Sequence, residues 1–384
     1  MPLLPALPAR PDFFSLSPQA FDALTVEWGW PKFRAAQVRD WVYKKGVVHP
    51  NRMSNLSFAD RERLTQALTF GDSEISVHQR SEDGTIKLLL RWPDGSSAET
   101  VMIPDGKRFT ACVSSQVGCP VGCKFCASGI GGAKGNLSAG QIVEQVIRLN
   151  QVMAESDEAT KRHSDGADES SSPSPPRRAG TPSLARQITN VVFMGMGEPL
   201  ANYANVMSAI RILHDTNCMN LGARRMTIST VGVPPKIREL AREELPLNLA
   251  ISLHAPNEHL RRELIPWAEH FSIEEILSAA RYYFDQTGRE ITLEYILLAG
   301  VNDRPEHARQ LAQVCQTLRA NVNLIRYNEV ATLPFGRPTS DDVMTFQSIL
   351  RHNNVNAHVR KSRGRDIDAA CGQLRRKELV QLGS

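Results

Sequence analysis

The sequence lacks any long hydrophobic run. No stretch of about 18 apolar residues occurs in the chain, so a helix that crosses a membrane is not expected. The start, MPLLPALPARPDFF, has several prolines but neither a basic segment nor a continuous apolar one, which argues against an export signal. We therefore expect a cytoplasmic protein with no membrane partner.

A strong excess of one charge is also missing. The 45 Lys and Arg residues face 41 Asp and Glu residues, which leaves a formal net charge of +4. That excess is too small to require a polyanionic partner, although local basic runs can still bind phosphate. Hydrophobic residues make up 41% of the 384 residues, enough for one large domain with a smaller appendage. We expect a monomer.

The first part of the chain changes from a helical to a strand-like pattern. In FRAAQVRDWVYKK the apolar residues recur close to helical spacing. Further on, ISVHQR, TIKLLLRW and AETVMIP are separated by the turn-forming DG pairs of SEDGT and PDGSS. We expect an N-terminal helical domain over 1–72 and a β-hairpin extension over 73–104.

Beyond residue 105, short β-rich runs alternate with helical ones. The β-rich runs are TACVSSQV, ITNVVFMG, RMTISTVG, LNLAISLHA, ITLEYILLAG and VNLIRYN. This alternation predicts a parallel α/β barrel or part of one, which we place at 105–376, with a tail at 377–384. Within it, 155–186 is rich in Ser, Pro and charge and has scarcely any large apolar residue, so we expect a disordered surface insertion.

The seven cysteines are odd in number, and three of them lie within eight residues. The segment CVSSQVGCPVGCKFCASG supplies Cys119, Cys123 and Cys126 in a C-x3-C-x2-C arrangement, which suits metal ligation better than a disulfide scaffold. Three thiolates would leave one iron of a cubane iron–sulfur cluster open for a chelating substrate. A zinc ion completed by a fourth Cys or His is the alternative.

Five separated motifs make the interpretation more specific. CVSSQVGC, VVFMGMGEPL, TISTVG, ISLHA and RGRDIDAACGQL occur in the order seen in the RlmN/Cfr group of the radical S-adenosylmethionine (SAM) superfamily. The resemblance runs from about residue 30 to 376. It implies an α/β fold: a partial (β/α)6 TIM-like radical SAM barrel with a small N-terminal helical accessory domain and a β-hairpin extension.

The resemblance also implies cofactors and a reaction. One [4Fe-4S] cluster per chain would be held by Cys119, Cys123 and Cys126, and two SAM molecules would be used per turnover. The reaction would methylate carbon 2 of an adenine in 23S rRNA and in tRNA. Cys371 would carry the methyl group as S-methylcysteine, and Cys112 would resolve the covalent intermediate through a transient disulfide with Cys371. An electron donor such as flavodoxin or ferredoxin would be needed.

Further residues are implied by the same resemblance. Glu99 of AETVMIP would accept the proton that leaves the adenine carbon. The implied SAM contacts are Gly197, Glu198, Ser229, Ser252, Leu253, His254 and Asn328, each near an expected strand end. The N-terminal helices and the basic runs that begin at Arg224, Arg360 and Arg375 are candidates to hold RNA phosphates while the target base is flipped into the pocket.

Two other functions stay open at this point. Methylation of carbon 8 of adenine, as in Cfr-like members, uses the same cysteine pair and cluster. A non-catalytic, zinc-stabilised RNA-binding protein would need four metal ligands and no SAM. The colour of anaerobically purified protein separates the second alternative from the enzyme, because an iron–sulfur protein is brown.

Overall fold

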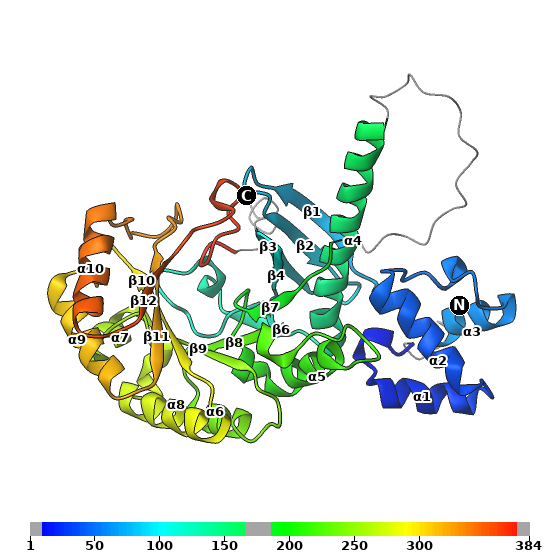
Figure 1. Ribbon diagram of the computed structural model, residues 1–384, viewed down its shortest axis with the longest axis horizontal. Coiled ribbons are helices and arrows are strands. Elements are labelled where there is room, and N and C mark those ends of the chain that lie inside the picture. Colours follow the sequence, from blue (N-terminus) through cyan, green and yellow to red (C-terminus); the bar gives the residue numbers. More distant parts are fainter. Residues whose placement is uncertain (1–9, 166–185, 375–384) are drawn as a thin grey trace, which may run out of the picture. The chain divides into compact units, whose positions relative to one another are not determined.

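The computed structural model describes residues 10–165 and 186–374, which form two compact units. One unit is helical and the other is built around a β-sheet (Figure 1). The helical unit comprises residues 10–73, 138–165, 186–187 and Met207–Leu221, and the sheet unit comprises the other described residues.

The helical unit begins with short helices around an aromatic core. Its first helices are α1 (Pro18–Glu27), α2 (Lys32–Arg39) and α3 (Phe58–Ala67), and a π-helical turn follows α2 at Asp40–Lys44. Ser17 and Ser57 cap α1 and α3, because each hydroxyl accepts the backbone N–H three residues further on. The ring of Phe13 packs against those of Phe21 and Phe70, with centroids 4.9 and 4.8 Å away.

The helix α4 (Ala139–Asp165) belongs to the helical unit, although the sequence places it inside the barrel domain. The backbone N–H of Ser73 donates to Glu144 (3.0 Å), and Arg148 donates to the carbonyls of Gly71 (2.9 Å) and Ser73 (2.7 Å). These bonds attach α4 to the chain that precedes the first strand. The domain boundaries expected from the sequence stay a proposal.

The end of α4 also differs from the expected disorder of 155–186. The helix continues through Asp165, because MAESDEATKR contains no glycine or proline to end it. Residues 166–185 of the expected insertion lie outside the described residues, as does the expected tail at 377–384.

The sheet unit starts with an antiparallel extension. β1 (Glu74–Arg80), β2 (Ile86–Arg91) and β3 (Ser97–Asp105) pair antiparallel in sequence order. β3 then pairs antiparallel with β4 (Arg108–Cys112), which places Val101 opposite Cys112. The three expected β-rich runs before residue 105 are therefore strands.

From β4 onward the sheet is parallel. In the described part of the chain ten strands form one sheet, in the order β1-β2-β3-β4-β7-β8-β9-β10-β11-β12. The strands after β4 are β7 (Asn190–Phe193), β8 (Met226–Thr230), β9 (Asn248–Ser252), β10 (Ile291–Leu297), β11 (Ala320–Arg326) and β12 (Ala357–Arg360). β1 and β12 stand at opposite ends of this order, so the barrel is partial.

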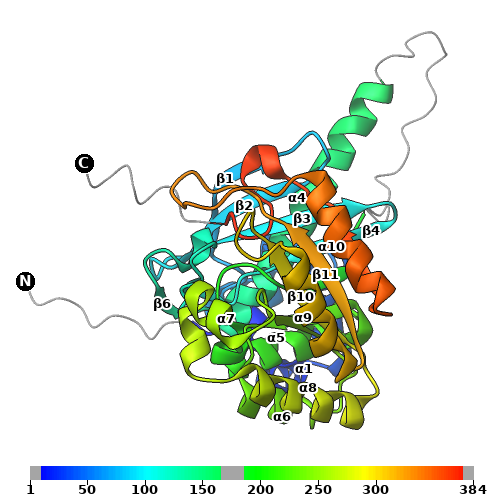
Figure 2. The same cartoon turned by 90° about the vertical axis from the view of Figure 1, so that its left-hand side faces the viewer.

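Helices connect successive parallel strands. They are α5 (Tyr203–His214), which spans both units, α6 (Pro234–Leu240), α7 (Glu258–Leu264), α8 (Ile273–Thr287), α9 (Pro305–Gln316) and α10 (Ser340–His352). Figures 1 and 2 show α6, α8, α9 and α10 along the outer face of the sheet. This arrangement follows from parallel pairing, because each connection must return the chain to the same end of the sheet.

Each of the six β-rich runs expected beyond residue 105 contains a strand, but three strands were not expected. β12 is short, and β5 (Gln116–Gly118) and β6 (Ala133–Asn136) form a separate small hairpin. Gly118 has a positive φ of 81°, and a Cβ there would lie 2.1 Å from the Gly132 carbonyl oxygen. Only glycine therefore permits this hairpin, which sets the ends of the cysteine loop.

Candidate active site

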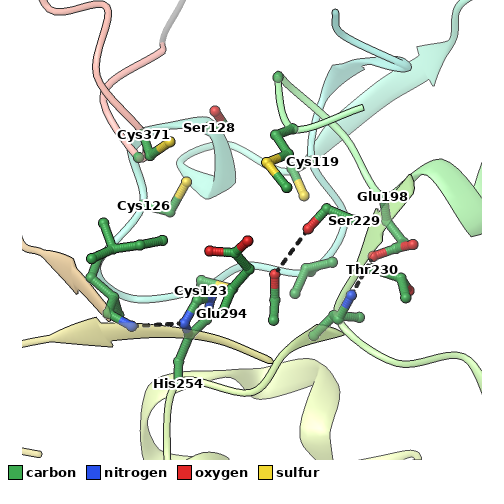
Figure 3. Close-up of a pocket in the computed structure, with 18 of the residues that line it drawn as sticks. Cys119, Cys123, Cys126, Ser128, Glu198, Ser229, Thr230, His254, Glu294 and Cys371 are labelled. Atoms are coloured by element: carbon green, nitrogen blue, oxygen red, sulfur yellow. Dashed lines mark hydrogen bonds between the residues drawn. The ribbon is translucent and has the colours of Figure 1, made fainter. Parts of the chain in front are cut away.

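Cys119, Cys123 and Cys126 lie on the loop between β5 and β6 and line one cavity (Figure 3). The N–H of Lys124 donates to the carbonyl of Leu264 at the end of α7 (2.9 Å), which supports the loop. Burial raises the pKa of the Cys119 thiol to about 12 and also raises the pKa of Cys123 and Cys126. The loop therefore offers three soft donors, and a bound metal would favour their deprotonation.

The cavity lies at the carboxyl ends of the parallel strands. About 830 Å³ of space that protein atoms do not fill lies among its lining residues, part of it open to solvent. The expected SAM contacts that line it are Gly197, Glu198, Ser229, Ser252 and His254. The sheet therefore brings most of the expected contacts together around the three cysteines.

Glu198 is held rigidly in the wall of this cavity. Its side chain accepts the N–H of Leu200 (2.9 Å) with one oxygen and the N–H of Val231 (2.8 Å) with the other. Burial raises the pKa of Glu198 to about 7, and the two N–H donors oppose that rise. The preceding Gly197 has a φ of 109°, and a Cβ there would lie 2.7 Å from Gln116. Only glycine lets this loop pass so closely.

Glu294 is a cavity residue that the sequence did not single out. Figure 3 shows its carboxylate pointing into the cavity, although the residue is only 3% exposed. One oxygen accepts from the side-chain amide of Asn323 (3.0 Å), and the other has no hydrogen-bond partner among the described residues. Burial raises the pKa of this carboxyl, and Arg360 lowers it. A buried acceptor without a donor indicates a ligand that donates.

Glu294 could have been identified as a cavity residue only from the register of β9 and β10. Ser252 and Glu294 are paired positions on these neighbouring parallel strands, so both side chains leave the same face of the sheet. Ser229 of β8 lies next to them, with its hydroxyl 3.4 Å from that of Ser252. A row of polar groups thus crosses three strands.

His254 has an unusual backbone and a neutral ring. Its φ of 58° is left-handed, a conformation that costs free energy outside glycine. Its carbonyl accepts from Asn302 (2.8 Å), and its Nδ1 accepts from the N–H of Ile296 (3.1 Å). Nδ1 is therefore unprotonated and Nε2 carries the proton. Burial, helped by Arg261, lowers the pKa of His254 to about 3.

Cys371 reaches the cavity because the C-terminal segment docks on the cysteine loop. The N–H of Ala127 donates to the Gly372 carbonyl (2.8 Å), and the Ser128 hydroxyl donates to the Leu374 carbonyl (2.8 Å). Asn328, an expected SAM contact, donates to the carbonyl of Cys371 (3.3 Å). Figure 3 shows Cys371 near Cys126 at the edge of the cavity.

A second cavity of about 560 Å³ lies beside the first, and Cys371 lines both. Cys112, the last residue of β4, lines the second cavity and is 6% exposed. Burial raises the pKa of Cys112 to about 12, the Cys371 thiol adds to that rise, and Arg360 opposes it. The structure therefore brings the two expected catalytic thiols together. Asn328 lines this second cavity and not the first.

Arg360 begins one of the basic runs that are candidates to hold RNA phosphates. It lines both cavities, and its guanidinium donates to the sulfur of Met194 (3.6 Å). The charges of Cys371, Glu294 and Cys112 all raise the pKa of Arg360. The sequence shows only a basic run, whereas the fold turns this member of the run inward.

Glu99 and Leu253 line neither cavity. Glu99 is buried on β3 and forms an ion pair with Lys87 (3.4 Å). The Ser114 hydroxyl donates to the Glu99 carbonyl (2.6 Å). Leu253 is fully buried, and its N–H donates to the Glu294 carbonyl (3.1 Å). Their expected roles therefore stay proposals.

The donor set fits an iron–sulfur cluster. In a cubane each thiolate binds a different iron, so the sulfurs need not converge on one point. Among residues 10–165 and 186–374 no group of three or more His, Cys, Asp or Glu side chains surrounds a position for a single metal ion. Three partly buried thiols on one loop, opening on a cavity, suit a cluster with one open iron.

Known proteins resemble the chain over most of its length. Two family models match: "Ribosomal RNA large subunit methyltransferase N-terminal domain" over residues 12–69 and "Radical SAM superfamily" over residues 180–312. Proteins named "Probable dual-specificity RNA methyltransferase RlmN" from Bacillus cytotoxicus and Bacillus thuringiensis are 40% identical over 369 residues, which is 96% of this chain and 94% of each relative. The chain belongs to the RlmN family of radical SAM RNA methyltransferases.

A solved structure agrees with RlmN-family membership. The crystal structure of a radical SAM methyltransferase from Sphaerobacter thermophilus is 40% identical, with a TM-score of 0.84 over 95% of this chain and 99% of that chain. The expected family, the enzyme class and the partial barrel with a helical N-terminal region are confirmed. The zinc-stabilised, non-catalytic alternative is not supported.

RlmN-family membership also bears on cofactors and substrate. A radical SAM protein uses a [4Fe-4S] cluster and SAM, and an RNA methyltransferase acts on RNA. The number of cofactors and the residues that hold them stay proposals. None of the helices in the described part of the chain is long and apolar enough to cross a membrane.

Proposed function

We propose that this protein methylates carbon 2 of an adenine in 23S rRNA and in tRNA, with Cys371 as the methyl carrier. The observation that carries the proposal is the position of Cys371 on both cavities. In the first cavity it faces Cys119, Cys123 and Cys126, and in the second it faces Cys112. A sulfur in this position can receive a group from one cavity and deliver it into the other.

The first cavity would bind the cofactors. Cys119, Cys123 and Cys126 would hold the cluster, and when it is bound the cluster supplies the electron that cleaves SAM to a 5′-deoxyadenosyl radical. Glu198 would accept a hydrogen bond from the SAM ammonium group. Two backbone N–H donors hold its carboxylate in position for this contact. The unpartnered oxygen of Glu294 would accept from a ribose hydroxyl. The remaining proposed SAM contacts are Gly197, Ser229, Ser252, Leu253, His254 and Asn328.

The two thiols would then act in sequence. The sulfur of Cys371 bonds to the methyl carbon as the carbon–sulfonium bond breaks, and S-adenosylhomocysteine leaves. In the second half of the turnover the S-methyl group would lose a hydrogen atom to the 5′-deoxyadenosyl radical, and its carbon would bond to carbon 2 of adenine. The proton on carbon 2 would leave to a base, and the unpaired electron that remains on the adduct would pass to the oxidised cluster. The Cys112 thiolate would then attack the sulfur of Cys371 to form a disulfide. The electron pair of the broken sulfur–carbon bond would stay on the carbon, which takes up a proton to become the methyl group. A reductant restores both thiols.

Glu99 would take the proton that leaves carbon 2. It shares a face of β3 with Val101, and Val101 packs against Cys112. Lys87, its ion-pair partner, also donates to the Asp368 carbonyl (3.3 Å), just before the segment that carries Cys371. These contacts of its neighbours with Cys112 and with the segment before Cys371 support the proposal.

The second cavity suits a flipped adenine nucleotide. Ile103, Met194 and Ile325 supply apolar surface for a base, and Lys361 and Arg363 supply positive charge for its phosphates. We propose that the enzyme works as a cytoplasmic monomer, where thiols stay reduced, and takes its electron from a carrier such as flavodoxin or ferredoxin.

The test is to reconstitute the protein anaerobically with iron and sulfide and to add labelled SAM, reductant and an adenine-containing 23S rRNA fragment. We expect 5′-deoxyadenosine and methylated RNA together, and no methylated RNA from Cys371→Ala. Digestion of the RNA and NMR of the methylated nucleoside distinguish carbon 2 from carbon 8. A carbon 8 product would overturn the regiochemistry, and 5′-deoxyadenosine without RNA methylation would overturn the substrate.

A further inference from the structure

Arg261 of α7 is a buried cation with too few partners. The residue is 1% exposed. One guanidinium nitrogen, Nη2, donates to the carbonyl of Val231 (2.6 Å). Its other two nitrogens, Nε and Nη1, are buried and have no hydrogen-bond partner in the part of the chain that the structure describes. A buried charge with unsatisfied donors is strongly unfavourable, so this site indicates an anion that is absent from the polypeptide.

The nearest acidic group does not fill that role. Glu258 lies three residues before Arg261 on α7, and its charge raises the pKa of Arg261 against the larger lowering by burial. One oxygen of Glu258 accepts from the N–H of Ile273, and the other is buried without a hydrogen-bond partner among the described residues. The two side chains are therefore near each other without forming a hydrogen bond.

The cysteine loop lies against the same helix. Leu260 and Leu264 of α7 pack with Cys119, Cys123 and Cys126 in one apolar cluster. Arg261 donates to the carbonyl of Val231, which belongs to this same cluster, and the N–H of Lys124, the residue after Cys123, donates to the Leu264 carbonyl (2.9 Å). The unsatisfied cation and the expected cluster ligand are thus close neighbours inside the protein.

We propose that Arg261 is a positioning residue for the iron–sulfur cluster, and that its unsatisfied N–H groups donate to the anionic sulfur at Cys123. This inference rests on the proposed cluster at the three cysteines. Thiolates and bridging sulfides accept such hydrogen bonds, and a nearby positive charge stabilises the extra electron of a reduced cluster. Arg261 thereby holds the reduction potential at a less negative value than the loop alone would give.

Arg261 also links the cysteine loop to the proposed SAM contact Glu198 through hydrogen bonds. Its Nη2 holds the carbonyl of Val231, and the N–H of Val231 donates to Glu198 (2.8 Å). A purely structural arginine would act only through this chain of bonds. It would change SAM affinity when removed and leave the potential of the cluster unchanged.

The experiment compares the full-length wild type with Arg261→Gln, Arg261→Lys and Arg262→Gln, all reconstituted anaerobically. Arg262 is the next residue on α7 and is exposed, so Arg262→Gln is the matched control. Iron content and visible absorbance report cluster loading. A redox titration followed by electron paramagnetic resonance reports the midpoint potential without RNA or SAM.

We expect Arg261→Gln to shift the potential to a more negative value, by at least a tenfold change in the reduction equilibrium, or about 59 mV for one electron. Arg261→Lys keeps the charge but loses the forked donors, so its shift should be smaller. Arg262→Gln should match the wild type. If Arg261→Gln does not fold or load iron, Arg261→Lys decides the matter.

An unchanged potential in fully loaded Arg261→Gln, or in fully loaded Arg261→Lys where the glutamine variant does not load iron, would overturn this inference while leaving the proposed function intact. A wild-type protein that takes up no iron would overturn both. The two failures are therefore distinguishable by the iron content of the wild type alone.

Discussion

Cys112 and Arg360 end the first and the last parallel strands of the sheet, and the two residues line the same cavity. β4 and β12 are separated by five other strands in the sheet order, so only the curvature of the partial barrel brings their ends together. Burial and the Cys371 thiol raise the pKa of Cys112, and the guanidinium of Arg360 lowers it. Arg360 therefore favours the Cys112 thiolate, which the proposed disulfide step would require.

Replacing Arg360 should slow the release of methylated RNA. In Arg360→Met the pKa of Cys112 rises further, and each additional unit reduces the thiolate fraction about tenfold. Decay of the covalent protein–RNA complex, followed on denaturing gels, should slow by that order. Arg360→Lys keeps the charge and should recover part of the rate. An unchanged decay in Arg360→Met would show that Arg360 does not assist Cys112.

Removing the thiol of Cys112 and removing that of Cys371 should have opposite effects on the covalent protein–RNA adduct. Cys112→Ala keeps the methyl carrier but cannot form the disulfide, so the protein should accumulate covalently bound to RNA. Cys371→Ala has no carrier, so it should form neither the adduct nor methylated RNA. Mass spectrometry of the denatured complex measures both. Full turnover by either variant would contradict the proposed mechanism.

The cluster ligands can be distinguished from the other cysteines by iron content. Cys119→Ala, Cys123→Ala and Cys126→Ala should each lose most of the iron after reconstitution, because three thiolates are the minimum set proposed here. Cys315 is buried on α9 and lines neither site cavity. Cys315→Ala is therefore the control and should keep its iron. Equal iron in all four variants would exclude these residues as ligands.

Glu294→Gln should weaken SAM binding. A hydrogen bond to a charged acceptor is worth about 1.5–3 kcal/mol, which corresponds to an affinity loss of roughly tenfold to a hundredfold. Equilibrium binding of labelled SAM to the cluster-loaded protein measures the loss. Glu290→Gln, an exposed position just before β10, is the control. If both variants bind SAM alike, Glu294 does not contact the cofactor.

Asp12→Asn should stabilise the protein at neutral pH. Burial raises the pKa of Asp12 to about 6, and Glu144 and Asp72 add to the rise. A carboxyl with a raised folded-state pKa contributes stability below about pH 4, and this contribution is lost as pH rises through 6. Asparagine can still accept the Phe14 N–H without a charge to bury.

We expect a gain of about 1–3 kcal/mol in the unfolding free energy of Asp12→Asn at pH 7.5, and little gain at pH 4.5. Urea unfolding at both values, with the wild type in parallel, measures the difference. A gain of the same size at both pH values would show that titration of Asp12 is not its cause.

The sequence determined the features that depend on neighbours along the chain. The spacing of Cys119, Cys123 and Cys126, the motif order that identifies the family, and the alternation of β-rich and helical runs are all local patterns. Such patterns are informative because the hydrophobic periodicity within a segment indicates which secondary structure it forms. The cysteine loop and the six expected barrel strands were predictable for that reason.

Only the tertiary structure determined which residues the sheet brings to the cavities. Glu294 becomes a cavity residue through its register with Ser252, and a glutamate within a strand pattern gives no sign of that pairing. Arg360 belongs to a basic run in the sequence but is turned inward at the end of β12. Glu99, by contrast, lines neither cavity. Strand register and sheet curvature set these positions. The sequence did not predict them, because both depend on residues far apart in the chain.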